Sequence, residues 1–240
     1  MEESFNYVNI FETKGIEYLM TIAFFAILIP FWLYLKNPKA INEKFTQVIG
    51  TLSEKILKIP LGLFYSKNHT WMQLEKSGNA KVGLDDLLMH ITGEVNVSNF
   101  KQPGEKVRPG DVIAQIEQNG KQLNISSPIS GEVQSVNTSI NEDPSIINED
   151  PYGKGWILKI KPEKWIAETN TCLVAEDAEE WLKNELTRFK DFVASSMGNL
   201  SPEPSMTILQ DGGELSDNPL SGMPNEVWKD FQTKFLDQIG

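Results

Sequence analysis

The sequence predicts a mainly β fold with flanking α-helices and one N-terminal transmembrane helix. Between residues 65 and 161, clusters of Gly, Pro, Asn and Asp separate short apolar runs at intervals of about eight to twelve residues, which is typical of compact all-β domains. Residues 18–35 form an uncharged apolar run, and apolar residues at helical spacing occur on both sides of the β region. The pattern therefore favours one β domain with helices at its two ends.

The β region is long enough to bury one modest core, since a domain of about 100 residues encloses a single hydrophobic centre. Its predicted members are two tryptophans and six aliphatic residues: Trp71, Trp156, Val95, Val97, Val133, Val136, Ile157 and Ile160.

Several short motifs follow one another in this region. Residues 127–133 read SPISGEV and residues 148–156 read NEDPYGKGW, and they are preceded by HTWM at 69–72, VGLDD at 82–86 and PGEKV at 103–107. Together these motifs resemble the H protein of the glycine cleavage system over roughly residues 65–192. The resemblance implies a flattened β-barrel, or barrel-sandwich hybrid, of the lipoyl-domain type. It also implies a carrier that holds a lipoyl group on one lysine at a hairpin tip.

The lysine of that family lies eight residues before the proline of the SPISGEV run, and Gly120 occupies this position here. The pair Asn119-Gly120 is a strong signal for a two-residue hairpin turn. Such a turn pairs Gln118 with Lys121, and further along it pairs Ile116 with Leu123 and Ala114 with Ile125.

This register places Lys121 one step past the hairpin tip, within the strand. Two interpretations stay open for Lys121: a lipoyl site reached through a shifted turn, or an ordinary lysine at the end of a hairpin. Because the turn leaves no lysine at the tip, we predict that the chain carries no lipoyl group and no other cofactor.

The apolar run at 18–35 is long enough for one spanning helix, with Tyr18, Trp32 and Tyr34 as interfacial aromatics. Lysines are concentrated after the run, beginning with Lys36 and Lys39, whereas the charged residues before it are mainly acidic. The positive-inside bias then predicts a single-pass membrane protein with its N-terminus outside and its main domain in the cytoplasm, at the inner membrane if bacterial.

The chain divides into five predicted segments. They are an N-terminal segment with the transmembrane helix (1–36), an amphipathic helix and connector (37–64), the β domain with its C-terminal helix (65–192, the helix extending to about 198), a flexible linker (199–222) and a C-terminal amphipathic helix (223–240). The helical stripe at 41–59 could face the membrane, its own domain or a partner.

The last helix carries an apolar stripe that needs a surface in its own chain or in another protein, and we predict partner docking through it. The stripe consists of Trp228, Phe231, Phe235 and Ile239.

Composition excludes several functions. The net charge of −11 argues against nucleic-acid binding, which requires clustered Lys and Arg. The two histidines, His69 and His90, fit no metal-ligand spacing, and the single cysteine, Cys172, cannot form an intrachain disulfide. No nucleotide-binding or hydrolase motif is present. We therefore predict no catalytic residues and no metal site.

The leading hypothesis is a membrane-anchored, non-catalytic scaffold or accessory subunit of a cytoplasm-facing membrane complex, with a redox complex as one candidate. Its predicted partners are other subunits of that complex, and membrane lipid through residues 18–35. The first alternative is a membrane-tethered lipoyl carrier that uses Lys121. The second is a binding module whose hairpin region recognises a small molecule or a peptide.

Overall fold

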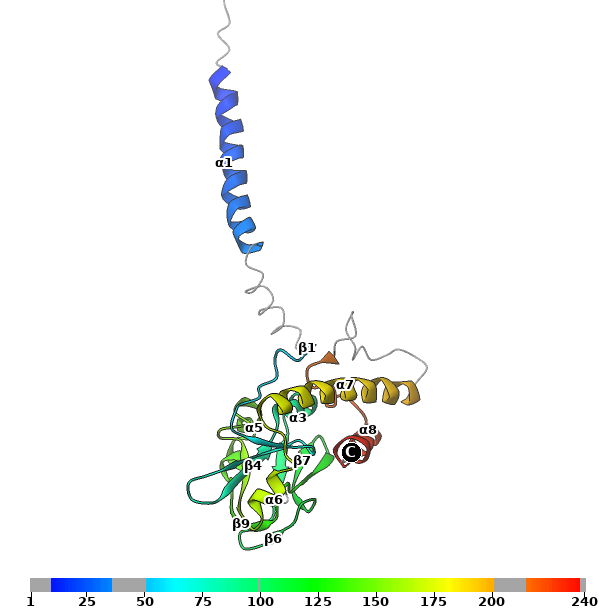
Figure 1. Cartoon of the computed structure of the whole chain (residues 1–240). Coiled ribbons are helices and arrows are strands. Elements are labelled where there is room, and N and C mark those ends of the chain that lie inside the picture. Colours follow the sequence, from blue (N-terminus) through cyan, green and yellow to red (C-terminus); the bar gives the residue numbers. More distant parts are fainter. Residues whose placement is uncertain (1–9, 36–50, 99, 201–214, 238–240) are drawn as a thin grey trace, which may run out of the picture. The chain divides into compact units, whose positions relative to one another are not determined.

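A computed structural model describes residues 10–35, 51–98, 100–200 and 215–237 of the 240-residue chain (Figure 1). The chain separates into two compact units, Met1–Gly50 and Thr51–Gly240. Each unit is described by itself.

The first unit contains helix α1, Ile10–Leu35. The side chains described in α1 run mainly from residue 18 to residue 29, and the large apolar ones among them are exposed. Over the described part of the chain, no helix combines the length and the apolarity required to cross a membrane. This finding overturns the predicted transmembrane helix, and with it the basis of the predicted membrane location and orientation.

Residues 41–50 of the predicted amphipathic helix lie outside the described residues, and the remainder of that prediction differs from the structure. Strand β1, Thr51–Leu52, occupies the start of this stretch and pairs with β11, Leu215–Ser216, near the other end of the chain. Leu52 and Leu215 are fully buried as partners. Nearby, the Lys58 backbone amide donates a 2.8 Å hydrogen bond to Asp86 Oδ2. Strand pairing and core burial therefore outweigh the local helical pattern here.

The described residues of the second unit contain nine further strands, and all their pairings are antiparallel. One sheet has six strands in the order β2-β3-β4-β10-β9-β6, and another has three in the order β5-β7-β8. The strands are β2 Phe64–Ser66, β3 Thr70–Leu74, β4 Ala80–Leu84, β5 Asn96–Ser98, β6 Lys106–Val107, β7 Val112–Gln118, β8 Lys121–Ser126, β9 Gly131–Val136 and β10 Trp156–Pro162.

The mainly β fold class is confirmed, but the described strands form separate open sheets and not the closed, flattened barrel that we expected.

Helices connect and flank these sheets. They are α3 Asp86–Thr92, α4 Ser139–Glu142, α5 Ile146–Glu149, α6 Trp165–Thr169, α7 Ala175–Leu200, α8 Asn225–Phe231 and a π-helical turn η1, Gln232–Leu236. Helix α3 begins at Asp85, whose carboxylate accepts a 2.8 Å hydrogen bond from the Leu88 amide, as expected for an N-cap.

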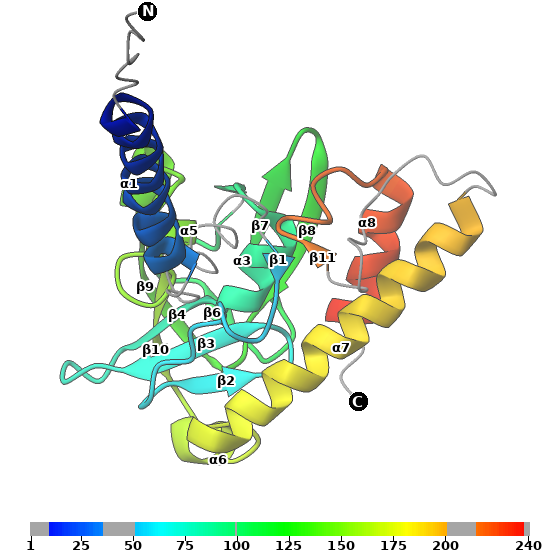
Figure 2. The ribbon, with the colours of Figure 1, turned by 90° about the horizontal axis from the view of Figure 1, so that it is seen from above.

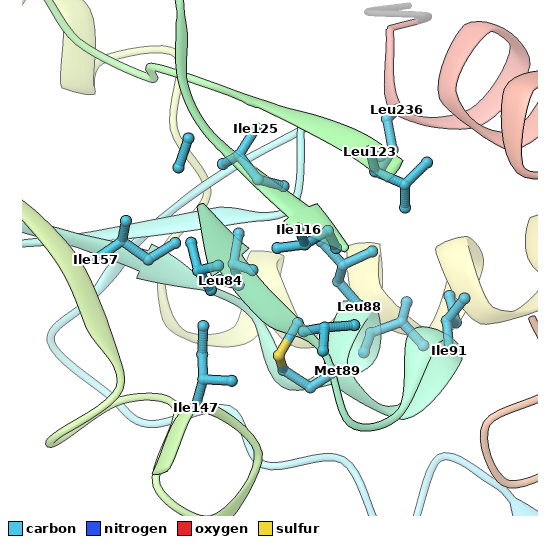
Figure 3. Close-up of a cluster of buried hydrophobic side chains, with 14 of the residues drawn as sticks. Leu84, Leu88, Met89, Ile91, Ile116, Leu123, Ile125, Ile147, Ile157 and Leu236 are labelled. Atoms are coloured by element: carbon cyan, nitrogen blue, oxygen red, sulfur yellow. The ribbon is translucent and has the colours of Figure 1, made fainter. Parts of the chain in front are cut away.

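The hydrophobic core lies among the two larger sheets, α3 and α7. Figure 3 shows Ile116 of the three-stranded sheet close to Leu84 of the six-stranded sheet, and Leu123 beside Leu236 of η1. Six of the eight predicted core residues are buried, while Val136 and Trp156 are half-buried. Trp71 is fully buried and donates from Nε1 to the Pro151 carbonyl at 3.1 Å.

Candidate functional site

The hairpin of β7 and β8 has the predicted register. Gln118 pairs with Lys121, Ile116 with Leu123, and Ala114 with Ile125. The turn residues Asn119 and Gly120 have φ angles of 51° and 78°, both in the left-handed region that this two-residue turn requires. Asn119 and Gly120 are exposed at the tip, and a Cβ atom added at Gly120 would meet nothing within 4 Å.

Lys121 begins β8 directly after this turn, and its side chain is half-buried. The Lys121 ammonium donates hydrogen bonds to the carbonyl oxygens of Ser221, at 2.6 Å, and Met223, at 3.0 Å. Its Nζ atom also lies 5.0 Å from the centre of the Trp228 ring, a cation–π distance. Burial lowers the pKa of the Lys121 amine from its ordinary value.

These contacts come from residues 215–237, which we call the C-terminal cap. Figure 2 shows the cap beside the β7–β8 hairpin and α7, and Figure 1 agrees. Its start is fixed on α3, because the amides of Asn218 and Leu220 donate to the carbonyls of His90 and Ile91. Its helical part is fixed on β8: the Asn124 amide donates to Gln232 Oε1 at 2.7 Å. Gln232 thus occupies the free edge of the three-stranded sheet.

The apolar stripe of the C-terminal helix is buried within the chain. Trp228, Phe231 and Phe235 are each at most 1% exposed. Phe231 and Phe235 pack edge-on against Phe189 of α7, each with ring centroids 5.7 Å apart. Ile239, the fourth predicted docking residue, lies outside the described residues. In this arrangement the stripe is covered by its own chain, so docking to a partner through it requires the cap to leave its place.

His69 is fully buried between the β domain and the cap. Its Nδ1 lies 2.8 Å from Asp85 Oδ2, and its Nε2 lies 3.7 Å from Glu185 Oε2, which is too long for a hydrogen bond. Burial by itself lowers the pKa of the His69 ring, but the two carboxylates outweigh burial and raise that pKa to about 9. The His69 ring is therefore held as a buried cation near neutral pH, and its role is structural.

His90 has a similar environment closer to the surface. It lies 3.0 Å from Asp217 of the cap and 3.6 Å from Asp86. Burial opposes protonation, yet the two carboxylates raise the pKa of His90 to about 9.

Cys172 is half-buried, and burial together with the nearby Glu168 raises the pKa of its thiol to about 11, so it is a poor nucleophile at neutral pH. Within the described ranges, no group of three or more His, Cys, Asp or Glu side chains is placed to hold a metal ion.

Comparison with known families decides the assignment of this domain. Residues 63–185, about half of the chain, match the family model described as glycine cleavage H-protein. The chain belongs to the glycine cleavage H-protein family. This confirms the resemblance carried by the sequence motifs. The cap and most of α7 lie beyond the residues matched to the H-protein family.

Curated relatives of the H-protein family cover the same part of the chain. A probable glycine cleavage system H protein of Pyrococcus horikoshii is 36% identical over 126 residues, which are 52% of this chain and 93% of that protein. The glycine cleavage system H protein of Psychrobacter cryohalolentis is 36% identical over 52% of this chain and 98% of its own length. A crystal structure of an H protein from Mycobacterium marinum matches 43% of this chain and 86% of its own, with 28% identity and a TM-score of 0.41.

Family membership corrects two functional predictions. H proteins carry a lipoyl group on a lysine, so the prediction that the chain has no cofactor is wrong. The prediction of a membrane-anchored, non-catalytic scaffold is also wrong, since the relatives are named as H proteins and the described residues contain no membrane span. The lipoyl carrier, which the sequence left as an alternative, agrees better with these findings.

Sequence reasoning named Lys121, Asn119 and Gly120 as candidate residues, but it missed the groups that contact the Lys121 amine. Ser221 and Met223 contribute backbone carbonyls, which leave no sequence signature. The one available signal was the aromatic stripe of the cap, which required a surface to cover it.

Proposed function

We propose that this chain is a lipoyl carrier of the glycine cleavage H type, with Lys121 as the attachment residue. The observation that carries this proposal is the presence of a lysine amine at the end of the β7–β8 hairpin, one residue from the position of the family's lysine. We further propose that the six-stranded and three-stranded sheets, with the core between them, represent the barrel-sandwich hybrid of lipoyl domains.

The residues present fit a lipoyl group. Attachment requires an uncharged primary amine, and burial shifts Lys121 in that direction by lowering its pKa. The turn beside it is exposed, and the space around Gly120 is open. The amine itself is engaged by the carbonyls of Ser221 and Met223, so attachment needs those two contacts to break.

Lipoate, once bound through an amide, supplies a disulfide that can accept and release a group or electrons. The chain's own residues hold the attachment lysine in position. The hairpin presents Lys121 at its end, and the register from Gln118 to Ser126 fixes the strand that carries it. Ile116 and Leu123 anchor the base of this hairpin in the core.

We propose that the chain is not itself an enzyme and that it works with other proteins. A carrier needs partners that load and unload it, and the relatives are named as parts of a glycine cleavage system. The acidic net charge of −11 favours partners with basic surfaces around their active-site entrances.

The test is expression of the full chain together with a lipoyl ligase and lipoate, followed by peptide mass spectrometry. We expect a lipoyl adduct on the peptide that contains Lys121, and none on the same peptide from Lys121→Arg, which keeps the charge but offers no acylable amine. A lipoyl adduct confined to another lysine, or no adduct on any peptide of a folded chain, would show that Lys121 is not the attachment residue.

A further inference from the structure

The Lys121 amine contacts three groups that belong to the cap. It donates hydrogen bonds to the carbonyl oxygens of Ser221, at 2.6 Å, and Met223, at 3.0 Å, and the Trp228 ring centre lies 5.0 Å away. Two carbonyl oxygens and an aromatic face suit an ammonium ion, which has three donors and a charge, better than an acylated nitrogen, which has one donor and no charge. The same contacts that stabilise the free lysine therefore oppose its modification.

The cap holds these groups in place through contacts of its own. Trp228 is fully buried and donates from Nε1 to the Leu220 carbonyl at 2.8 Å, which joins α8 to the turn before it. Gln232 accepts a hydrogen bond from the Asn124 amide of β8. Arg188 of α7 donates to the Phe235 carbonyl at 3.0 Å and lies over the Phe235 ring, with Cζ 3.9 Å from its centre. The cap is thus packed on both the hairpin and α7.

We propose that the C-terminal cap is an autoinhibitory latch on Lys121: it must open before the amine can be acylated, and acylation in turn weakens its hold on the hairpin. The nature of the acyl group, lipoyl, rests on the proposed function, whereas the latch itself rests on the contacts of the unmodified amine. Because the two effects are linked, the free energy by which the closed cap disfavours the acylated amine at equilibrium equals the free energy by which acylation shifts the cap toward its open state.

The chemistry of acylation explains why the closed cap and the acylated amine disfavour each other. Nζ, as the neutral amine, attacks the carbonyl carbon of an activated lipoyl group, a mixed anhydride with a nucleotide phosphate. The N–C bond forms, the C–O bond to the phosphate breaks, the phosphate leaves with the bonding pair, and one amine proton passes to solvent. The amide product keeps one N–H and no charge, so it cannot donate to both Ser221 and Met223 or bind the Trp228 face as a cation.

The experiment measures how fast single lysines of the full chain react with an acetylating reagent, by peptide mass spectrometry. Lys106, whose side chain is 76% exposed, is the internal reference. In the wild type we expect Lys121 to react roughly tenfold or more slowly than Lys106, because two hydrogen bonds to a charged donor must break. Trp228→Ala should raise the Lys121 rate several-fold and leave the Lys106 rate unchanged. Thr233→Ala, an exposed position on η1, should change neither rate.

Gln232→Ala provides a milder opening variant, because it removes the hydrogen bond to Asn124 and keeps every aromatic residue of the cap. It should also raise the acetylation rate of Lys121, and it keeps the test valid if Trp228→Ala proves to be unfolded. The reciprocal readout is amide hydrogen exchange, which should be faster over residues 218–236 in chain acetylated at Lys121 than in unmodified chain.

The latch is overturned if Lys121 reacts as fast as Lys106 in the wild type, or if Gln232→Ala and every folded opening variant leave its rate unchanged. Parallel incubation with lipoyl ligase, lipoate and ATP separates the two proposals. Equal lipoylation of wild type and Gln232→Ala would support the carrier and contradict the latch. Faster acetylation of Gln232→Ala, without lipoylation of either chain, would support the latch and contradict the carrier.

Discussion

His69 and Phe235 stack with their ring centroids 5.3 Å apart and an angle of 10° between their planes. His69 belongs to the first motif of the β domain, and Phe235 belongs to the cap, which lies outside the residues matched to the H-protein family. The His69 ring also lies near Trp181 of α7, with centroids 5.2 Å apart. A buried, charged imidazole therefore joins the domain, α7 and the cap.

The first prediction concerns pH. The pKa of His69 and that of His90 are each raised to about 9 by neighbouring carboxylates, from an ordinary value of 6.5. The folded chain then binds more protons than the unfolded chain between these values, so the stabilisation is complete below about pH 6.5 and is lost as pH rises through about 9. We expect the free energy of unfolding to fall across this window by at most about 1.4 kcal/mol per pH unit for each histidine.

Chemical denaturation at a series of pH values measures this slope. His90→Gln should remove its own share of the slope and leave that of His69, because His90 is partly exposed whereas His69 is fully buried. A free energy of unfolding that stays constant from pH 6.5 to 9.5 would contradict the buried-cation description.

The second prediction concerns packing of the cap. Phe231 is fully buried and stacks on Phe235 with centroids 4.7 Å apart, so Phe231→Ala leaves a cavity among aromatic rings. We expect a loss of about 3–5 kcal/mol in the free energy of unfolding. Thr233→Ala, exposed on the neighbouring turn, should change it by less than about 0.5 kcal/mol. A small effect of Phe231→Ala would mean that the cap contributes little to the folded chain.

The third prediction concerns a close approach in the β domain. A Cβ atom at Gly83 would lie 2.6 Å from atoms of the Trp71 indole, which is fully buried and cannot move aside easily. Gly83→Ala should therefore destabilise the domain by roughly 1–3 kcal/mol in thermal or chemical unfolding. Gly222→Ala is the matched control, since a Cβ atom there meets nothing within 4 Å. Equal stability of the two variants would contradict the packing of Trp71 on Gly83.

The fourth prediction restores a lysine at the family's position. Gly120 has open space around its α-carbon, so the side chain of Gly120→Lys should extend from the turn, away from the cap. The φ angle of 78° costs this variant roughly 1 kcal/mol or more of stability. With lipoyl ligase we expect faster lipoylation at position 120 of Gly120→Lys than at Lys121 of the wild type, measured by peptide mass spectrometry. A folded variant that the ligase does not modify at position 120 would show that the ligase does not recognise a lysine by its place in the turn.

The sequence was sufficient where the signal is local. Alternation of apolar residues and the Asn119-Gly120 pair predicted the β7–β8 register correctly, because turn type and side-chain parity together fix the pairing. Residues 51–59 were predicted as helix from spacing alone, yet Leu52 pairs with Leu215, a partner that no local pattern identifies. The hydrogen bonds of the Lys121 amine likewise depend on backbone carbonyls far along the chain.

The most direct test of the carrier proposal is the occupancy of Lys121 in the chain purified from the cells in which it occurs naturally, grown with lipoate available. Intact-mass measurement followed by peptide mapping gives the fraction of chain with a lipoyl group and its position. The proposal predicts a lipoyl adduct on Lys121, with the free amine retained in any fraction whose cap remains closed. Chain that carries no lipoyl group on Lys121 under these conditions would contradict it.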